Sequence, residues 1–175
     1  VRVYFAKKCA WTFTYGIRAK ELYVKSGVKM SSISVIGNSL DDRLLERDYK
    51  RLSSLTNRGI SKENFKIIFV GRLTDRKKVD LLINAVAKLN LDGEKVLLTI
   101  VGDGPEKGTL ESLVQAGNLQ GVVRFVKASY GSHVNELIFN SDLSVSPGHI
   151  GLFGIHSLSL GVPIVTHDDF ANHAP

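Results

Sequence analysis

Short runs rich in Val and Ile alternate with longer segments of helical periodicity along most of this 175-residue chain. The runs are almost unbroken by polar residues, which is typical of strands buried on both faces of a parallel sheet. The expected strands are residues 33–36, 66–70, 96–101, 122–126, 143–145 and 163–165. This pattern limits the fold strongly, because a sheet of such strands needs helices to cover it.

The segments between these runs have the spacing of amphipathic helices. In segment 77–89 five apolar residues fall on one helical face: Val79, Leu82, Ile83, Val86 and Leu89. Further helices are expected at residues 106–116, 132–140 and 151–160, the first of them started by Pro105. Strands and helices that alternate with short connections imply right-handed crossovers. The predicted fold class is α/β, a Rossmann-like parallel sheet with helices on both faces.

A seam between two domains is expected near residues 37–42, where turn-forming residues follow a predicted strand. We interpret residues 1–40 as the end of an amino-terminal domain and the junction, with a strand at residues 1–5. We interpret residues 41–175 as the Rossmann-like domain. The chain stops soon after the last predicted strand, so we expect a piece of a longer protein whose second domain is truncated at its carboxyl end.

The net charge of +6 is concentrated near the start of the chain. Residues 1–60 carry 12 Lys and Arg against 5 Asp and Glu, whereas residues 61–175 carry 11 against 12. Such a basic segment is either a solvated helix face, the commoner case, or a surface for nucleic acid or anionic lipid. The aromatic motifs of RNA-binding domains and the cysteines of zinc fingers are absent, so no nucleic-acid partner is expected. Peripheral contact with a membrane stays open.

Composition points to an ordinary globular protein, with 43% hydrophobic and 23% charged residues. The single cysteine, Cys9, excludes an internal disulfide, and a reducing cytoplasm is the simplest location. No apolar stretch reaches the roughly 18 residues that span a bilayer, and no signal peptide is recognisable. We therefore predict a cytoplasmic protein, with the inner face of the membrane as its only candidate membrane contact.

Ligands of α/β sheets bind at the carboxyl ends of the strands, so the turns that follow strands are informative. The first such turn is Gly71-Arg72-Leu73, followed by Lys77. Glycine allows close backbone approach, arginine grips a phosphate with two hydrogen bonds, and lysine adds a compact charge. The turn is a candidate diphosphate site. Spacing alone leaves open that Arg72 and Lys77 are ordinary solvated charges.

The second turn contains Gly102, Gly104 and Gly108, in a spacing related to dinucleotide-binding fingerprints. The usual fingerprint follows the first strand of such a unit, and Pro105 removes an amide that could face phosphate. We interpret the turn mainly as a tight connection to a helix. The alternative is an NAD(P) site, for which Arg124 is the one charged candidate for a ribose partner.

The third turn, residues 146–156, contains two glycine-bearing bends before a predicted helix. Free amides at a helix start favour anions. His149 lies in the loop and His156 in the helix, where each either faces a ligand or packs, and packing is the commoner role of a lone histidine. The five histidines lack the spacing of metal ligands, so no metal site is predicted.

Taken in order, these turns resemble the carboxyl-terminal domain of the group-1 (family 4) glycosyltransferases, which have the GT-B fold of two facing Rossmann-like domains. Five segments carry the resemblance: residues 33–41, 71–77, 101–105, 141–147 and 161–165. They are similar to the family's V-I-x-N-G-V-D, G-R-L-x-x-x-K and V-G-x-G-P motifs, to the strand before its donor loop, and to its G-x-P-V-V strand. The resemblance implies that residues 1–32 are the last strand and helix of the amino-terminal domain.

The resemblance also implies an activity. Family members transfer a sugar from a nucleotide-diphosphate sugar with retention of anomeric configuration and without a bound metal or other cofactor, commonly in polysaccharide or glycoconjugate biosynthesis. Arg72 and Lys77, beside Gly71, match the catalytic pair that binds the diphosphate. Fixed cations there would stabilise the charge that grows on the leaving group. The acceptor is unknown, and the fragment alone is expected to be inactive because the amino-terminal domain would complete the cleft.

The donor loop departs from the family pattern. Family members carry two glutamates eight positions apart, one toward the sugar and one toward the ribose, and the matching residues here are Gly148 and His156. His156 can hydrogen-bond a ribose hydroxyl but cannot supply a carboxylate's charge. Two alternatives stay open, a catalytically inactive nucleotide-sugar-binding relative and, less favoured, an NAD(P)-dependent oxidoreductase. The predicted donor-binding residues are Gly71, Gly148, His149, Gly151, Leu152, Phe153 and His156.

Overall fold

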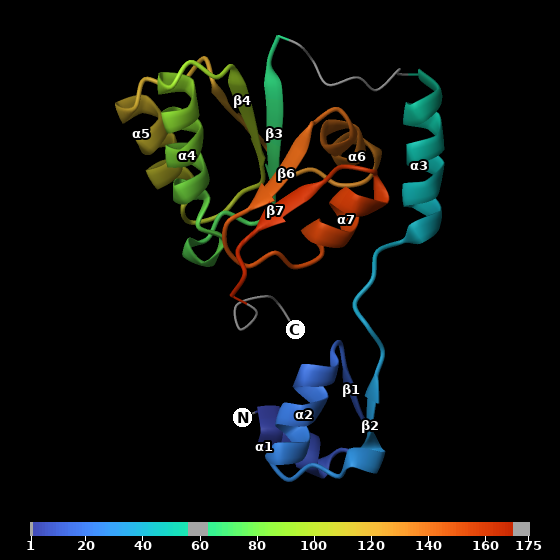
Figure 1. Ribbon diagram of the computed structural model, residues 1–175. Helices are drawn as coiled ribbons and strands as arrows, with labels where there is room; N and C mark the ends of the chain where they lie inside the picture. The colour runs from blue at the N-terminus through green and yellow to red at the C-terminus, as the bar shows by residue number, and fades with distance from the viewer. Residues whose placement is uncertain (1, 56–62, 170–175) are drawn as a thin grey trace. The chain divides into compact units, whose positions relative to one another are not determined.

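The computed structural model describes residues 2–55 and 63–169 (Figure 1). The chain divides between Leu40 and Asp41 into two compact units. We call residues 1–40 the first unit and residues 41–174 the second unit. This division lies at the seam expected from the turn-forming residues, whereas the assignment of the first unit to an amino-terminal domain stays a prediction.

The first unit contains two helices and two short parallel strands. Its elements are α1 (Arg2–Lys8), β1 (Thr12–Thr14), α2 (Ile17–Lys25), the 3-10 turn η1 (Met30–Ser32) and β2 (Ile33–Val35). Strands β1 and β2 pair in parallel, with Thr12 opposite Ile33. The core is small, formed by Ala6, Val28 and Ile33 with Tyr23 and Val24 packed against them.

The strand predicted at residues 1–5 is wrong, because Arg2–Lys8 form helix α1. The β-branched and aromatic residues at the start of the chain favour a strand by propensity alone. In the helix, however, Ala6 enters the core while Tyr4 and Phe5 remain 62% and 61% exposed. Ala6 is thus the residue of α1 that packs in the core, and tertiary contacts commonly override propensity.

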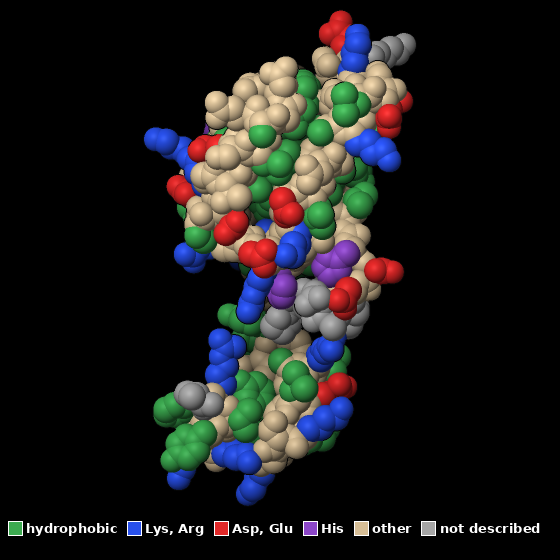
Figure 2. Space-filling view, turned by 90° about the vertical axis from the view of Figure 1, so that its left-hand side faces the viewer, with side chains coloured by type: hydrophobic (Ala, Val, Ile, Leu, Met, Phe, Trp, Pro, Cys, Tyr) green, Lys and Arg blue, Asp and Glu red, His purple; other side chains and the backbone are tan. Residues whose placement is uncertain are grey.

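Much of the apolar surface of the first unit is exposed. Figure 2 shows hydrophobic side chains interspersed with Lys and Arg in the lower part of the view. Phe13 and Ile17 are 64% and 68% exposed. Large exposed apolar areas mark surfaces that other protein or a membrane covers. This unit therefore leaves apolar surface open to contact with other protein or with a membrane.

The second unit is a five-stranded parallel sheet with helices on both faces. Its elements are α3 (Asp42–Leu55), β3 (Phe65–Val70), the 3-10 turn η2 (Asp75–Lys77), α4 (Val79–Leu91), β4 (Val96–Val101), α5 (Lys107–Ala116), β5 (Val123–Val126), α6 (Ser132–Phe139), β6 (Leu143–Ser146), α7 (Phe153–Ser159) and β7 (Ile164–Thr166). The six strands predicted from residue 33 onward are all present, with ends shifted by at most one residue. The α/β prediction is confirmed.

The strand order is β5-β4-β3-β6-β7, and every pair is parallel. The chain builds outward from β3 through β4 to β5, then returns to place β6 on the other side of β3. Ligands of doubly wound sheets bind where the order reverses in this way. Here the reversal lies between β3 and β6. The loops that follow these two strands therefore meet at the carboxyl edge of the sheet.

Helices α4 and α5 cover one face of the sheet, while α6 and α7 cover the other and α3 packs on them (Figure 1). Consecutive residues Ile68 and Phe69 of β3 are both fully buried, because each side of the strand faces a helical layer. Full burial of such side chains stabilises the fold by about 1.5–3 kcal/mol each. The unbroken apolar runs of the sequence are thus explained by burial on both faces.

The turns after β3 and β4 are joined backbone to backbone. The amide of Leu73 donates to the carbonyl of Asp103 at 2.8 Å, and the amide of Glu106 donates to the carbonyl of Leu73 at 3.1 Å. A Cβ on Gly104 would lie 2.2 Å from the Leu73 oxygen, so a side chain cannot fit there. Gly104 therefore allows the two turns to pack closely, which agrees with the interpretation of the second turn as a tight connection to a helix. Helix α5 begins at Lys107, two residues after Pro105.

We expect Gly104→Ala to destabilise the second unit, because the new methyl group would collide with the Leu73 carbonyl. The loss should be about 2–4 kcal/mol of unfolding free energy, measured by urea denaturation. Gly108→Ala is the matched control, since this glycine lies in α5 with nothing within 4 Å of an added Cβ. That substitution should instead stabilise the protein by about 0.5–1 kcal/mol. Equal stabilities of the two variants would contradict the close-packing role.

Candidate functional site

Lys77 lies at the reversal point of the sheet. It belongs to the 3-10 turn η2, which follows β3, and α4 begins only at Val79. The predicted helix start at residue 77 is therefore two residues early. Lys78 adopts a left-handed conformation, with φ of 50°, that separates the two helical segments. This bend leaves the Lys77 side chain in the loop rather than on the helix.

The Lys77 ammonium contacts the loop that follows β6. It donates a short hydrogen bond to the carbonyl oxygen of His149. A Cβ built on Gly151 would lie 3.8 Å from the Lys77 Nζ. Burial lowers the pKa of Lys77. No carboxylate among the described residues forms an ion pair with it, so this half-buried amine has a neutral carbonyl as its partner.

The loop after β6 packs directly on the backbone of η2. The amide of His149 donates to the carbonyl of Arg76 at 3.0 Å. A Cβ on Gly148 would lie 2.1 Å from that oxygen and 2.9 Å from the carbonyl carbon of Lys77. Only glycine fits at this position while the loop keeps its course. Gly148, which the resemblance matches to a family glutamate, thus lies in a loop that leaves no room for a side chain.

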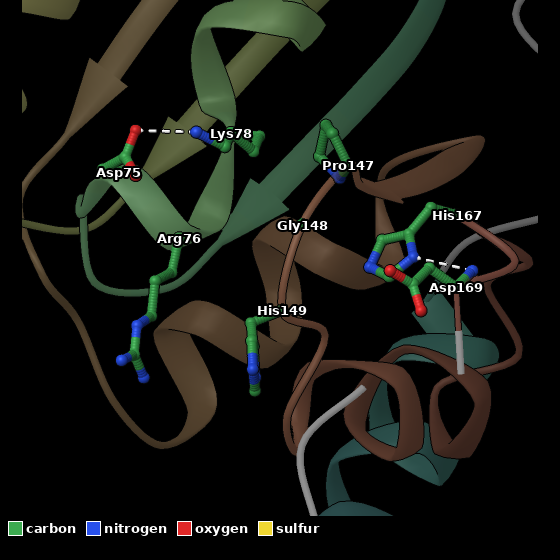
Figure 3. A pocket seen from close by; sticks show the side chains of 8 residues that line it. All are labelled: Asp75, Arg76, Lys78, Pro147, Gly148, His149, His167 and Asp169. Carbon is green, nitrogen blue, oxygen red and sulfur yellow. Dashed lines mark hydrogen bonds and ion pairs between the residues drawn. The ribbon is translucent and has the colours of Figure 1, made fainter. Parts of the chain in front are cut away.

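Next to this contact the protein surface forms a hollow of about 530 Å³ (Figure 3). Its lining residues are Asp75, Arg76, Lys78, Pro147, Gly148, His149, His167 and Asp169. Arg76 and His149 extend in the same direction in this view, while Lys78 is held by an ion pair to Asp75 at 2.7 Å. The amide of Asp169 donates to Nδ1 of His167 at 3.1 Å. The hollow thus combines basic groups, imidazoles and carboxylates.

Arg72 lies at a second hollow on the same edge of the sheet. This hollow, of about 430 Å³, is lined by Val70, Gly71, Arg72, Val101, Gly102, Asp103, Ala128, Ser129 and Tyr130. The Arg72 side chain is exposed, and the Tyr130 side chain is 88% exposed. Residues 128–130, which follow β5, were not predicted to take part in a site. They could have been included, because a segment that follows a parallel strand lies at the carboxyl edge of the sheet.

The remaining predicted donor-binding residues, at the start of α7 and just before it, have different surroundings. Gly151 adopts a positive φ of 59°, which suits glycine. Phe153 begins α7, two residues later than predicted, and its ring packs edge-on against Phe69 at 6.1 Å between centroids. The Phe153 side chain therefore belongs to the core. The amides of Gly151, Leu152 and Phe153 make no backbone hydrogen bond to any described residue, so each remains a candidate donor to a ligand.

His156, which the resemblance matches to the second family glutamate, contacts another helix. Its Nε2 lies 2.5 Å from Oδ1 of Asn135 in α6. The Nδ2 of Asn135 in turn donates to Oδ2 of Asp48 in α3 at 2.7 Å. Burial lowers the pKa of His156. Contact of this imidazole with a nucleotide stays a prediction.

Asp48 and Asn135 were not foreseen from the sequence. They are 2% and 3% exposed, respectively. Burial alone would raise the pKa of Asp48, but hydrogen bonds from Asn135 and Ser132 and the nearby Arg47 outweigh it and hold the pKa below its ordinary value. The available signal was a carboxylate on the same helical stripe as Leu45 and Leu52, since a polar residue on a buried stripe needs a partner.

The structure thus brings Lys77, Gly148, His149 and Gly151 together and places Arg72 at the neighbouring hollow. Among the residues that the structure describes, no group of three or more His, Cys, Asp or Glu side chains is arranged to hold a metal ion. Within the same residues, no helix is both long and apolar enough to cross a bilayer. Arg124 donates to Thr99 at 3.3 Å within the sheet, which removes support for it as a ribose partner.

The chain is similar in sequence to parts of longer proteins. The chain is 29% identical over 105 residues to alpha-D-kanosaminyltransferase of Streptomyces kanamyceticus, covering 58% of this chain and 27% of that protein. It is 29% identical over 137 residues to N-acetyl-alpha-D-glucosaminyl L-malate synthase of Bacillus anthracis, covering 76% of this chain and 35% of that protein. The chain therefore spans only about a third of the length of these relatives.

Solved structures share the fold at low sequence identity. HepE of Anabaena, in complex with UDP and glucose, has a TM-score of 0.71 at 21% identity and covers 94% of this chain and 46% of that one. The pneumococcal O-GlcNAc transferase GtfA, in complex with UDP and GlcNAc, has a TM-score of 0.73 at 16% identity and covers 95% and 32%. The family model of the glycosyl transferases group 1 matches residues 54–173. Since that match covers more than half of the chain, this protein belongs to the group-1 glycosyl transferases, and its fold is that of GT-B enzymes.

Proposed function

We propose that this chain is the donor-binding part of a retaining glycosyltransferase. The whole protein transfers a sugar from a nucleotide-diphosphate sugar to an acceptor whose identity is open, in polysaccharide or glycoconjugate biosynthesis. The reaction as proposed needs the donor and the acceptor, and no metal or other cofactor. Retention of configuration follows from the family resemblance, and an NMR measurement of the anomeric configuration of the product tests it.

The observation that carries this proposal is the half-buried Lys77. An amine that loses solvation without gaining a carboxylate is costly, and such groups cluster at functional sites. The amides of Gly151 and Leu152, which donate no backbone hydrogen bond to a described residue, lie in the loop that contacts this lysine. A diphosphate would supply the negative charge that Lys77 lacks as a partner. It would also accept hydrogen bonds from the ammonium and from these two amides. Arg72, at the same edge of the sheet, would contribute a second cation to the leaving group.

The oxidoreductase alternative loses its support in the turn after β4. Gly102 and Gly104 lie against the carbonyls of Gly71 and Leu73, so their lack of side chains already has a packing reason. The catalytically inactive relative stays a genuine alternative, because no carboxylate occupies the Gly148 position. Transfer or hydrolysis of radiolabelled sugar nucleotides by the full-length protein separates an enzyme from a binding protein.

The location of the protein is proposed as cytoplasmic, with peripheral attachment to an anionic membrane as an extension. The excess of Lys and Arg in residues 1–60 supports the extension. Sedimentation with vesicles rich in anionic lipid at low salt tests it. Absence of binding would remove the membrane from the proposal without affecting the sugar-transfer activity.

Lys77→Met should weaken binding of UDP, measured by calorimetry, by about 10- to 100-fold, because the substitution removes the charge that faces the diphosphate. Lys88→Met is the matched control, since Lys88 is exposed near the end of α4 and its loss changes the net charge equally. We expect the control to bind UDP as the unchanged protein does. If both variants bind alike, Lys77 is not part of the nucleotide site.

A carboxylate cannot be restored at position 148 without moving the loop. Gly148→Glu and Gly148→Ala should each lower the melting temperature and weaken UDP binding by about 10-fold, because the Cβ would strike the Arg76 carbonyl. Gly121→Ala is the control, since an added Cβ there meets nothing within 4 Å. A Gly148→Glu variant with unchanged stability and higher transfer activity would contradict this account.

A further inference from the structure

Three side chains in contact with one another link the helices α3, α6 and α7. Asp48 of α3, Asn135 of α6 and His156 of α7 are joined by contacts of 2.7 Å and 2.5 Å. Asp48 and Asn135 are almost completely buried, so water does not compete for these bonds. Each member comes from a different helix on the same face of the sheet. The arrangement therefore fixes the side chains relative to one another more firmly than a surface contact would.

The chemistry of these three groups decides which of them donates and which accepts in each hydrogen bond. An ionised carboxylate only accepts hydrogen bonds, and hydrogen bonds from Asn135 and Ser132 favour the ionised form of Asp48 despite its burial. The amide group that faces Asp48 must therefore be the NH₂ of Asn135. The carbonyl oxygen of the same amide then faces His156. No other orientation of Asn135 satisfies the buried carboxylate.

The orientation of Asn135 sets the proton position on His156. An amide oxygen only accepts, so the Nε2 that lies against it must carry a hydrogen. Burial lowers the pKa of His156, which keeps the ring neutral near pH 7 with a single ring proton. That proton is on Nε2. The other nitrogen, Nδ1, then has a free lone pair.

The Nδ1 atom is available to a ligand. It makes no hydrogen bond to any described residue, and the single fully buried, unpartnered side-chain atom among these residues is Ser146 Oγ. His156 also lies in α7, the short helix that begins at Phe153 after the loop that contacts Lys77. Nδ1 therefore keeps solvent access in the element that follows the donor loop.

We propose that Asp48 and Asn135 are positioning residues that hold His156 in its Nε2–H form, so that Nδ1 accepts a hydrogen bond from a ribose hydroxyl of the donor. The proposal rests on the proposed function for its ligand, whereas the proton position follows from the three side chains alone. A neutral acceptor takes over the hydrogen bond that a glutamate would make. It also avoids placing a second negative charge near the diphosphate.

The proton position is tested first, by NMR of the protein with ¹⁵N-labelled histidine and no nucleotide. Long-range couplings distinguish the two neutral forms of an imidazole, and His156→Gln identifies the signals. We expect the Nε2–H form for His156 in the unchanged protein. Finding the Nδ1–H form there would overturn the proposal, and this measurement requires no destabilising variant.

Asp48→Asn then tests the role of the carboxylate, because asparagine keeps the shape but can donate as well as accept. Asn135 can now turn either way, so both forms of His156 should appear. Glu46→Gln is the matched control, an exposed carboxylate on the same helix with the same change of charge. A pure Nε2–H form in Asp48→Asn would overturn the positioning role.

Nucleotide binding tests the ligand. The dissociation constant of UDP should rise in Asp48→Asn by the reciprocal of the Nε2–H fraction measured by NMR, about 2-fold for an equal mixture. Binding of 2′,3′-dideoxy-UDP should be the same in Asp48→Asn and Glu46→Gln, because it offers no hydroxyl to Nδ1. A purely structural role of Asp48 would weaken both nucleotides equally, and this outcome would overturn the proposal.

Failure of the proposed function gives a different result. If the unchanged protein binds neither UDP, GDP nor ADP, the donor assignment fails and the ribose contact fails with it, while the NMR result still reports the proton position. If UDP binds and its affinity is independent of the Nε2–H fraction, the ribose contact alone is overturned.

Discussion

The contact between the loop after β6 and the backbone of η2 is the interaction on which the candidate site depends. Parallel pairing of β3 with β6 brings the two loops to one edge, and the hydrogen bond from the His149 amide to the Arg76 carbonyl fixes their spacing. Gly148 permits this approach because it has no side chain. The course of the loop, its contact with Lys77 and the lack of a side chain at position 148 therefore depend on the same close approach.

The fold was largely predictable because burial on both faces leaves a direct trace in the sequence. The runs that became β3 and β4 contain almost only apolar residues, and their ends were predicted within one residue. The start of the chain was mispredicted, since residues 2–5 favour a strand locally while Ala6 packs in a helix. The strand order could not be derived, because periodicity records which face is buried but not which strand is the neighbour.

The candidate site was predictable in part. Arg72 and Lys77 were identified from residue type and from the position of their turn after a strand, which the topology places at the ligand-binding edge. Asp48 and Asn135 were missed because their pairing joins residues 87 positions apart, which no local pattern records. The contact of Gly148 with Arg76 was likewise invisible. Close approach of two backbones depends on the course of both loops rather than on either sequence.

The bond from Lys77 to the His149 carbonyl has a consequence for how the loop after β6 is held. The acceptor belongs to the loop that lies against the amine, so the lysine fastens that loop to η2 by a side chain as well as by the backbone. If the proposed donor binds here, little of the loop would remain to be ordered, and preorganisation of this kind strengthens binding.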